Sequence, residues 1–529
     1  MDLSVSWRSE GFRGGAVAAS LALCTLALSW PVADLGVPRA SDRNQYESVA
    51  FNLVRHGEFH DFDPEERMRK RDVAYSRREP GYSLYLAAVF AFSPEFASLS
   101  HACLLDPACE AADPLRRRVW QLTFLLGAGA VALTFVMTFL LTASWTVSIA
   151  AGGLGMLLIP PLLARDIPSF LAGVFLLTHA TLAAHAWRKP RMATGLLSGV
   201  ALGLLVLTKA VFQYWLAGVA LALAAGLWLD ADRRRSLAPA CAALLIGACL
   251  LTLPWMVRNA VQAGQFGISG RDGELLAIRA EYGRMTWPEL RGAFAFYLPN
   301  LPVVGDRARS IALRWLEPET FGYTRFDRDN PEGFYGKAKD DTGEVAARAD
   351  LIDPGWRASQ ASKDAALKQA AIDLMRTDWL KQAALTLVFA ERGARVSVGS
   401  CRTLTDPAHQ RFGWAIGWPM GHACNLARIW AVLLIPVAGV LLALAWRRRS
   451  VALALLLLPI VYGFGIHALA THFIERYSRP LIPVLVVVAA LVANELAPRA
   501  DRVAARLGSL AFDAARRRLR VGGRHPSAT

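Results

Sequence analysis

The sequence predicts an all-α polytopic membrane protein, and three observations support this class. Of the 529 residues, 54% are hydrophobic, more than a soluble chain usually carries. Apolar runs of about 17 to 25 residues recur, which is the length that an α-helix needs to cross a bilayer. Basic residues gather where these runs end, as expected for membrane topology. About ten transmembrane helices are predicted, at residues 13–33, 119–141, 147–164, 168–187, 193–208, 211–229, 238–256, 427–446, 450–467 and 480–497.

The net charge of +15 raises the question of a nucleic-acid partner. The basic clusters, however, follow the ends of the apolar runs. They lie at 188–191, 233–235, 447–449 and 516–518. With Arg8 and Arg13 in the cytoplasm, all of these clusters fall on the cytoplasmic side. The charge therefore indicates contact with membrane lipid, and no nucleic acid is expected as a partner.

The segment from Gly81 to Phe92 is apolar but short, and Pro80 and Pro94 bound it. Counting it as a span would reverse the charge bias of the loops that follow. We therefore expect a helix that lies on the outer membrane surface. The first span ends at Ala33 with Pro31 near its end, which favours a retained anchor over a cleaved signal peptide.

These features define four parts of the chain. Residues 1–257 form an N-terminal transmembrane module, within which residues 34–118 are a long polar segment, here called the first loop. Residues 258–425 are a large polar region, here called the insert region, which we expect to be mostly helical and external. Residues 426–497 return to the membrane, and residues 498–529 form a basic cytoplasmic tail.

The first loop opens with a predicted helix. Apolar residues recur at helical spacing after the candidate N-cap Ser41, and His56-Gly57 ends the pattern. Asp42 then lies in the first turn, where the helix dipole favours an ionised carboxylate. The simpler alternative is that Asp42 only stabilises the helix.

The cysteines sort by predicted topology. Cys103 and Cys109 share the first loop, and Cys401 and Cys424 lie in the insert region. Two pairs on an oxidising face predict two disulfides, Cys103–Cys109 and Cys401–Cys424. Zinc is the alternative, but no histidine stands at ligand spacing. No metal site is therefore expected.

Several charged residues stand at the outer ends of spans. A carboxylate at this position is costly unless it is paired or exposed to water, so Asp166 is a candidate site residue, with a local Arg165–Asp166 pair as the alternative. Lys209 ends a glycine-rich span and breaks the positive-inside pattern. It is a candidate anion-binding cation, against the alternative that its side chain only reaches toward the membrane surface.

Two further arginines stand in proline-containing strings. Arg258 lies in Pro254-Trp-Met-Val-Arg-Asn259, where it serves either to bind phosphate or to anchor the helix at the interface with Trp255. Arg476 and Arg479 are three residues apart at the entry to the last span, so both could flank one anion, or Glu475 could neutralise one of them.

The insert region contains no specific motif. Residues from Lys363 to Arg392 carry apolar side chains at helical spacing, which predicts an amphipathic helix or a helix pair. Glu274 and Glu281 are two helical turns apart and are expected to share a face. The string from Gly270 to Gly273 is expected to be a turn.

Four separated strings resemble one family. They are Asp42–Tyr46 together with Arg78–Tyr82, then Asp166, then Pro254–Asn259, then Arg476–Pro483. In order and predicted side, they resemble the GT-C superfamily of membrane glycosyltransferases. The similarity is to the bacterial branch of the dolichyl-phosphate-mannose protein mannosyltransferase and aminoarabinose transferase family. It covers most of the chain except residues 280–420.

The resemblance implies an inverting transferase that moves a sugar from a polyprenyl-phosphate donor to a lipid, glycan or protein acceptor. It implies a multi-pass location in the bacterial cytoplasmic (inner) membrane, with the active site facing the periplasm. No cofactor is expected, because Asp42 and Asp166 without further ligands make a poor site for a hard cation. By the same resemblance, Asp42 and Asp166 are the catalytic carboxylates. The candidate phosphate-binding residues are Lys209, Arg258, Arg476 and Arg78. The candidate substrate-lining residues are Tyr46, Tyr82, Glu79 and Tyr477.

The chain departs from the aminoarabinose transferase in two places. Arg43-Asn44-Gln45 stands where that enzyme has an acidic residue and an arginine, and Glu79 stands where it has a lysine. The donor contacts are therefore expected to differ.

Other functions remain open. A lipid or sugar transporter or flippase also has many helices with charged ends, and another polyprenyl-linked glycan polymerase or ligase would share the donor chemistry. A membrane scaffold or sensor is a further alternative. Against transport, the spans show no evident inverted repeat, and the polar residues gather on one face.

Overall fold

The structure is a computed structural model. It describes residues 7–33, 43–63, 77–163, 167–296, 333–338, 356–394, 438–441, 443–444, 447, 450–473 and 475–495. Within these ranges every regular element is a helix. The fold is therefore all-α throughout the described part of the chain, as predicted.

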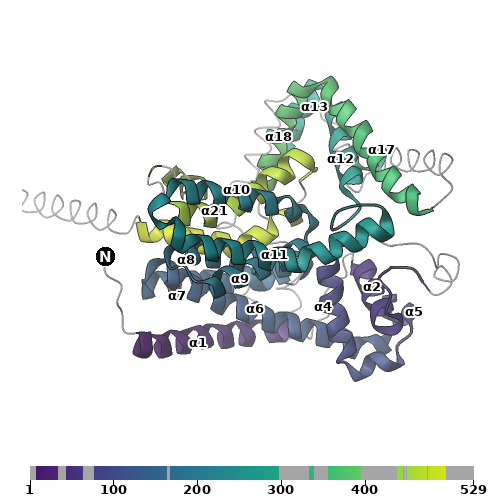
Figure 1. Ribbon diagram of the computed structural model, residues 1–529. Helices are drawn as coiled ribbons and strands as arrows, with labels where there is room; N and C mark the ends of the chain where they lie inside the picture. The colour runs from purple at the N-terminus through teal and green to yellow at the C-terminus, as the bar shows by residue number, and fades with distance from the viewer. Residues whose placement is uncertain are drawn as a thin grey trace, which may run out of the picture.

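The elements fall into three groups, labelled as in Figure 1. The bundle contains α1 (Trp7–Ala33), α6 (Asp113–Thr142), α7 (Trp145–Leu163), α8 (Ile167–Arg188), α9 (Met192–Thr208), α10 (Trp215–Leu229), α11 (Arg234–Ala263) and α21 (Val451–Ala470). The first loop contains α2 (Arg43–His56), α4 (Pro80–Ala91) and α5 (His101–Leu105), with the short 3-10 helices η1 (Pro94–Ser98) and η2 (Glu110–Ala112). The insert region contains α12 (Asp272–Glu281), α13 (Trp287–Phe296), α17 (Trp356–Thr377) and α18 (Trp379–Ala394), with η5 (Tyr282–Arg284).

Five stretches of described helix are long and apolar enough to cross a membrane. They are Glu110–Thr142, Ile167–Arg188, Ala210–Leu229, Ala231–Ala263 and Val451–Ala470. Shorter apolar helices lie where other spans were predicted, at Gly14–Ala27, Trp145–Ile159 and Met192–Thr208. These findings establish a polytopic membrane protein. The predicted total of about ten spans is not confirmed, because most of residues 427–446 lie outside the described ranges.

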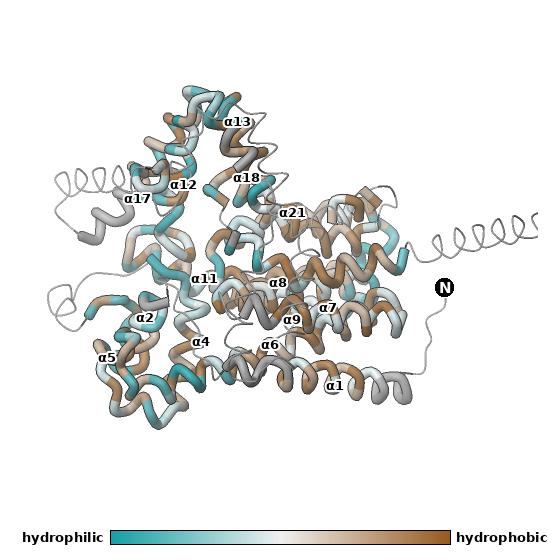
Figure 2. The backbone as a smooth tube through the Cα atoms, turned by 180° about the vertical axis from the view of Figure 1, so that it is seen from behind, coloured by the Kyte–Doolittle hydropathy of each residue, from teal (hydrophilic) through white to brown (hydrophobic). Residues whose placement is uncertain are grey.

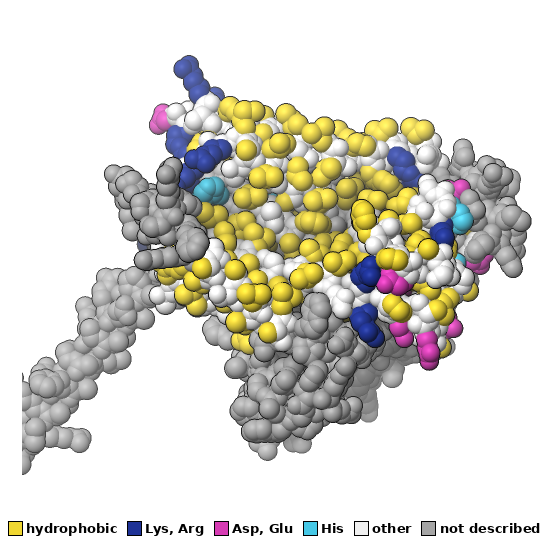
Figure 3. Space-filling model, turned by 90° about the horizontal axis from the view of Figure 1, so that it is seen from below, with side chains coloured by type: hydrophobic (Ala, Val, Ile, Leu, Met, Phe, Trp, Pro, Cys, Tyr) yellow, Lys and Arg dark blue, Asp and Glu magenta, His cyan; other side chains and the backbone are white. Residues whose placement is uncertain are grey.

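The bundle helices run side by side and are apolar along their length, whereas polar segments gather at one end, here called the loop end (Figures 1 and 2). A broad band of hydrophobic side chains covers the face seen in Figure 3, with charged side chains at its two ends. This distribution is the one that a bilayer requires, because apolar chains face lipid and charges stay at the interfaces.

Helices α9 and α11 pack through glycines. A Cβ atom on Gly195 would overlap the backbone of Ala240, and one on Gly199 would overlap the backbone of Leu244. Small residues allow membrane helices to approach this closely. The glycine-rich span predicted from the sequence is thus a close-packing face, and it fixes α9 firmly against α11.

His179 is a buried polar group inside the bundle. Its Nδ1 lies 3.2 Å from the carbonyl oxygen of Ser198 and 3.1 Å from the Ser198 hydroxyl. Trp215 Nε1 donates to its Nε2 over 3.4 Å. Because the Trp N–H can only donate, the ring is neutral with its proton on Nδ1. His179 therefore joins α8, α9 and α10.

Helix α11 is longer than a bilayer core is thick. It has 30 residues, which correspond to about 45 Å at 1.5 Å per residue, against a hydrocarbon core of about 30 Å. It continues without interruption through Pro254 and ends at Ala263, where Gly264 takes a left-handed conformation with φ +68°. The helix is therefore about 15 Å longer than the hydrocarbon core is thick.

The first loop confirms the predicted helices. Helix α2 ends at His56, and Gly57 takes the positive φ of +69° that closes it. Helix α4 runs across the loop end of the bundle (Figure 1), and its 12 residues are too few to span a membrane. The buried side chains Phe51, Leu86 and Phe90 belong to one hydrophobic core together with Val119 at the start of α6.

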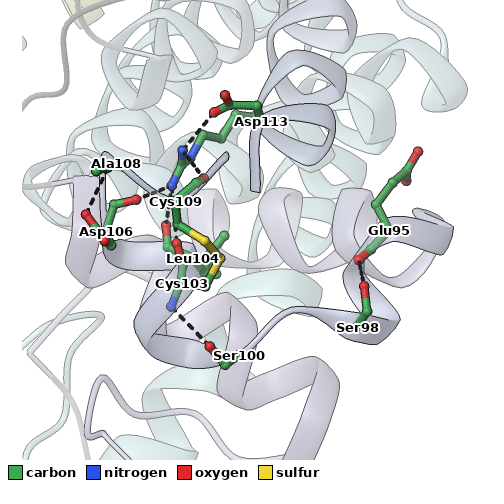
Figure 4. The surroundings of a disulfide bond; sticks show 10 residues. Glu95, Ser98, Ser100, Cys103, Leu104, Asp106, Ala108, Cys109 and Asp113 are labelled. Carbon is green, nitrogen blue, oxygen red and sulfur yellow. Dashed lines mark hydrogen bonds and ion pairs between the residues drawn. A yellow bond between two sulfur atoms is a disulfide. The ribbon is translucent and has the colours of Figure 1, made fainter. Parts of the chain in front are cut away.

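The predicted disulfide between Cys103 and Cys109 is present, with a Cα–Cα distance of 5.3 Å. Figure 4 shows the surroundings of this bridge, with Cys109 and Asp113 labelled. The Arg116 guanidinium donates to the carbonyl of Cys109 over 3.1 Å and to Asp113 Oδ1 over 2.9 Å. The bridge and the arginine together hold the loop against the start of α6. The second predicted pair, Cys401–Cys424, lies outside the described residues.

The insert region is helical where it is described. The predicted helix pair is α17 and α18, separated by Asp378. The hydrophobic core of this region contains Tyr282, Phe334 and Phe389, and it also contains Phe473, which follows α21. The insert region therefore packs against the end of the bundle through a shared hydrophobic core.

Arg279 is a fully buried arginine in this core, with 0% of its surface exposed. It donates to Gln382 Oε1 over 2.5 Å, to the Gln382 carbonyl over 3.0 Å and to the Thr386 hydroxyl over 3.2 Å. Its guanidinium lies 5.1 Å from the ring centre of Phe389. Burial lowers the pKa of Arg279 to about 10, so it stays charged at neutral pH and ties α12 to α18.

Replacing Cys103 by Ser should lower the free energy of unfolding by about 2 kcal/mol, the loop-closure value for a loop this short. It should also leave Cys109 open to a thiol reagent, which mass spectrometry detects. Cys249→Ser, within α11, is the matched control and should not expose Cys109. Labelling of both loop cysteines in the unreduced wild type would contradict the bridge.

Arg279→Met should lower the free energy of unfolding by about 2–4 kcal/mol, because Gln382 and Thr386 lose a buried charged donor. Thermal unfolding of the purified chain, with protease sensitivity of the insert region, measures the change. In the control Arg376→Met, the arginine side chain is 76% exposed, and a shift within about 0.5 kcal/mol is expected. Equal shifts in the two variants would show that Arg279 is not a structural tie.

Candidate functional site

The two predicted catalytic carboxylates lie outside the described residues. Asp42 directly precedes Arg43, the first residue of α2, and Asp166 directly precedes Ile167, the first residue of α8. Their roles therefore stay predictions. The helix after Asp42 carries Tyr46, and Ser169, close after Asp166, contacts Arg476.

Tyr46 and Glu79 form the centre of the described polar cluster at the loop end. The Tyr46 hydroxyl donates to Glu79 Oε2 over 2.9 Å. The rings of Tyr46 and Tyr82 meet edge to face at 5.2 Å. Helix α2 supplies Tyr46, whereas Glu79 and Tyr82 come from the start of α4, so the site is built by packing these two helices together.

Arg78 lies beside this pair. Its guanidinium is 5.2 Å from the Tyr46 ring centre, and its Nε donates to Gln45 Oε1 over 2.6 Å. Burial raises the pKa of Tyr46 well above its usual value, and the charge of Glu79 raises it further, while Arg78 and Arg476 act in the opposite direction. Tyr46 therefore remains a protonated donor at neutral pH.

Lys209 is brought to the same place by a backbone contact. A Cβ on Gly81 would lie 2.8 Å from the Thr208 nitrogen and 2.9 Å from the Leu207 carbonyl carbon, so only glycine fits there. The start of α4 thus rests directly on the end of α9, and Lys209 follows that end. The predicted cations Arg78 and Lys209 consequently stand on two sides of one contact.

Arg476 and Tyr477 approach from the segment after α21, in the 3-10 helix η7 (Glu475–Tyr477). The Arg476 carbonyl accepts a hydrogen bond from Ser169 over 3.3 Å, which places it beside the start of α8. The Tyr477 ring stacks on His467 at 4.4 Å, and the charge of Lys209 acts on His467. The structure therefore brings Arg476 and Tyr477 to the cluster, and it adds His467, which the sequence did not indicate.

Arg258 has an aromatic setting. Its guanidinium lies 4.8 Å from the ring centre of Trp255 and 5.6 Å from that of Phe59. Its Nη1 donates to Asn259 Oδ1 over 2.8 Å. These contacts agree with the interfacial-anchor alternative, and a phosphate-binding role for Arg258 stays a prediction.

The insert region contributes an ion pair that the sequence did not indicate. Arg271 binds Glu274 through two hydrogen bonds, Nε to Oε2 over 3.0 Å and Nη2 to Oε1 over 2.9 Å. Burial raises the pKa of Glu274. The hydrogen bonds and the charge of Arg271 act in the opposite direction and outweigh burial, so the pKa of Glu274 is lowered. The charges of Glu79 and Tyr477 also act on Arg271.

Asp272 fixes these residues to the bundle. It accepts a hydrogen bond from the Tyr214 hydroxyl and one from Gln213 Nε2 at 3.3 Å. The expected turn over Gly270–Gly273 is therefore wrong for Asp272 and Gly273, which begin α12. The physical reason is that Asp364 accepts from the Gly273 nitrogen over 2.8 Å, and acidic residues stabilise a first helical turn. The available signal was the run of charged residues at positions 271, 272 and 274.

Taken together, cationic and aromatic side chains surround a phenol–carboxylate pair at the loop end. Such a set suits a substrate that carries both an anionic group and hydroxyls, because guanidinium and ammonium groups bind phosphate oxygens while Glu and Tyr bind hydroxyls. Among the residues that the structure describes, no group of three or more His, Cys, Asp or Glu side chains could hold a metal ion.

No protein-family model matches the chain, and no curated protein matches it. Among solved structures, the chain is similar to the crystal structure of ArnT from Cupriavidus metallidurans bound to undecaprenyl phosphate. The identity is 14% and the TM-score 0.32, with 93% of this chain and 80% of that chain covered. At these values the likeness carries no argument about function, which rests on the residues described above.

Gly81→Ala should displace the turn that carries Arg78 and Glu79, because the added methyl group meets backbone atoms that cannot move aside. A loss of about 1–3 kcal/mol in the free energy of unfolding is expected. The double variant Gly81→Ala/Thr208→Ala should not recover it, since the clash with the Thr208 nitrogen remains. Gly129→Ala in α6 is the control, because nothing lies within 4 Å of its Cβ position. Similar unfolding temperatures for Gly81→Ala and Gly129→Ala would contradict the contact.

Proposed function

We propose that the protein is an inverting glycosyltransferase that moves a sugar from a polyprenyl-phosphate donor to an acceptor at the outer face of the membrane. The observation that supports this proposal most is the gathering of Arg78, Lys209 and Arg476 around the Tyr46–Glu79 pair at the loop end. A membrane-embedded lipid phosphate would meet these cations where the bundle ends. The acceptor is a lipid, a glycan or a protein.

The reaction is a single displacement. An acceptor hydroxyl or amine attacks the anomeric carbon and loses its proton, while the bond from that carbon to the phosphate oxygen breaks and its electron pair leaves with the polyprenyl phosphate. Attack opposite the leaving group inverts the anomeric centre. The phosphate gains charge as the bond breaks, so cations stabilise the transition state more than the bound donor.

Each residue has a proposed role. Asp42 takes the proton as general base, and Asp166 orients the acceptor or raises the pKa of Asp42 by charge repulsion. Arg78, Lys209, Arg476 and Arg258 are the proposed phosphate ligands. Tyr46, Tyr82, Glu79 and Tyr477 are proposed to line the sugar. No metal is part of the proposal, because two carboxylates alone make a poor site for a hard cation.

Transfer is tested with membranes that carry the wild-type chain or Asp42→Asn, supplied with a set of radiolabelled polyprenyl-phosphate sugars. Label should move from one donor to an acceptor in the wild type. The rate should fall by a factor of about 10² to 10⁴ in Asp42→Asn, the usual contribution of a general base. Thermal stabilisation of the variant by undecaprenyl phosphate should persist, because the phosphate ligands are intact.

Glu110→Gln is the matched control, since it neutralises an exposed carboxylate of the first loop and should transfer at the wild-type rate. Equal transfer by wild type and Asp42→Asn would remove Asp42 as the base. If no donor yields transfer and labelled lipid instead crosses the membrane, the protein is a transporter.

A further inference from the structure

Two adjacent residues of α2 contact the two adjacent residues that stand just before α4. Gln45 accepts hydrogen bonds from Arg78, and Tyr46 donates one to Glu79. Both contacts join residues that are 33 positions apart in the chain, so together they fix one alignment of the two segments. Arg78, a proposed phosphate ligand, is therefore attached to α2 directly beside the pair at the centre of the site.

Gln45 sets the plane of the Arg78 guanidinium. The amide oxygen Oε1 of Gln45 accepts from Arg78 Nε over 2.6 Å and also from Arg78 Nη2. An amide oxygen has two lone pairs, so it can accept both donors at once. The ring centre of Tyr46 lies 5.2 Å from the guanidinium, which restrains the group from a second direction. Arg78 is only 6% exposed, and these contacts hold its buried fork within the site.

The partner that Gln45 provides is neutral, and this property bears on anion binding. The planar fork of an arginine also matches a carboxylate, which would hold it at least as firmly. A carboxylate at position 45 would, however, place a negative charge against Arg78 and repel an anion that approaches it. Gln45 binds the same edge of the fork through an oxygen atom and adds no charge.

We propose that Gln45 is a positioning residue that holds the Arg78 guanidinium in the orientation in which it binds the donor phosphate, while adding no negative charge that competes with that phosphate. This inference rests on the proposed function and deepens it, because one neutral side chain then sets the affinity of the site for an anionic donor. Gln45 acts through Arg78 and is not itself a catalytic residue.

The substitution Gln45→Glu separates charge from geometry. It keeps the shape of the side chain and its acceptor oxygen, so we expect thermal unfolding at or above the wild-type temperature. The added charge should raise the KM for the donor and the Kd for undecaprenyl phosphate roughly tenfold, the order of effect of one nearby charge. An unchanged KM and Kd would overturn the proposal.

A double-mutant cycle tests whether Gln45 acts through Arg78. Gln45→Met removes the acceptor and should lower kcat/KM roughly tenfold, because the guanidinium is no longer held in place. In the Arg78→Met background the same substitution should have no further effect, since the group that Gln45 positions is gone. Losses that multiply in the double variant would overturn the proposal.

Gln382→Glu is the matched control for the added charge. Gln382 Oε1 likewise accepts from a buried arginine, Arg279, over 2.5 Å, but this pair lies in the core of the insert region. The control should leave the KM and the Kd at their wild-type values. A rise equal to that of Gln45→Glu would overturn the proposal, because the effect would then not depend on Arg78.

The binding measurement separates this proposal from the proposed function. If the wild type transfers no sugar from any donor, the proposed function fails, and Gln45 is then judged on undecaprenyl phosphate binding alone. Roughly tenfold weaker binding by Gln45→Glu would still support the positioning role. Equal binding by the two proteins, or no binding by the wild type, would overturn it.

Discussion

The close approach of α9 and α11 is the constraint on which the loop end depends. Because a Cβ atom at Gly195 or Gly199 would overlap the α11 backbone, the two helices cannot slide or separate without losing contact along their length. The end of α9 at Thr208 is therefore fixed relative to the bundle. The segments that carry Arg78 and Arg271 both rest on that end, so their mutual position follows from helix packing deep in the membrane.

Charged groups are costly to bury, and the site meets this cost by pairing and by partial exposure. Arg271 and Glu274 each keep 22% of their side-chain surface exposed and satisfy each other through two hydrogen bonds. Burial still raises the pKa of Asp272, and the Tyr214 hydrogen bond only partly offsets this effect. Two hydrophobic cores, one around Phe51 and one around Phe389, stabilise the segments that carry these polar groups. This packing offsets the free energy that is lost by burying charge.

Much of the fold could be predicted because its signals are local. Helix α2, the short helix α4 and the Cys103–Cys109 bridge each depend on residues within a few positions of one another, and all three predictions were confirmed. The prediction of a turn at Gly270–Gly273 was wrong because the deciding contact is not local. Its helical start depends on Asp364, 91 residues away, and no local pattern can indicate such a partner.

The candidate site was predictable in part for the same reason. Tyr46, Glu79 and Tyr82 lie in two strings of the first loop, and their contact follows once α2 and α4 pack. His467 and Arg271 have unremarkable local sequences. Only the folded chain stacks His467 on Tyr477 and binds Asp272, the residue after Arg271, to Tyr214. The alternative roles of Arg258 could not be separated from sequence, because the deciding neighbour Phe59 lies about 200 positions earlier.

Helix α11 has a mechanical consequence. It passes from the far end of the bundle to Ala263 as one continuous rod, and only eight residues separate its end from the start of α12 at Asp272. A rod this long turns a small tilt inside the bilayer into a larger lateral shift at its tip. The glycine contacts between α9 and α11 limit this shift, and with it the movement of the segment that begins α12.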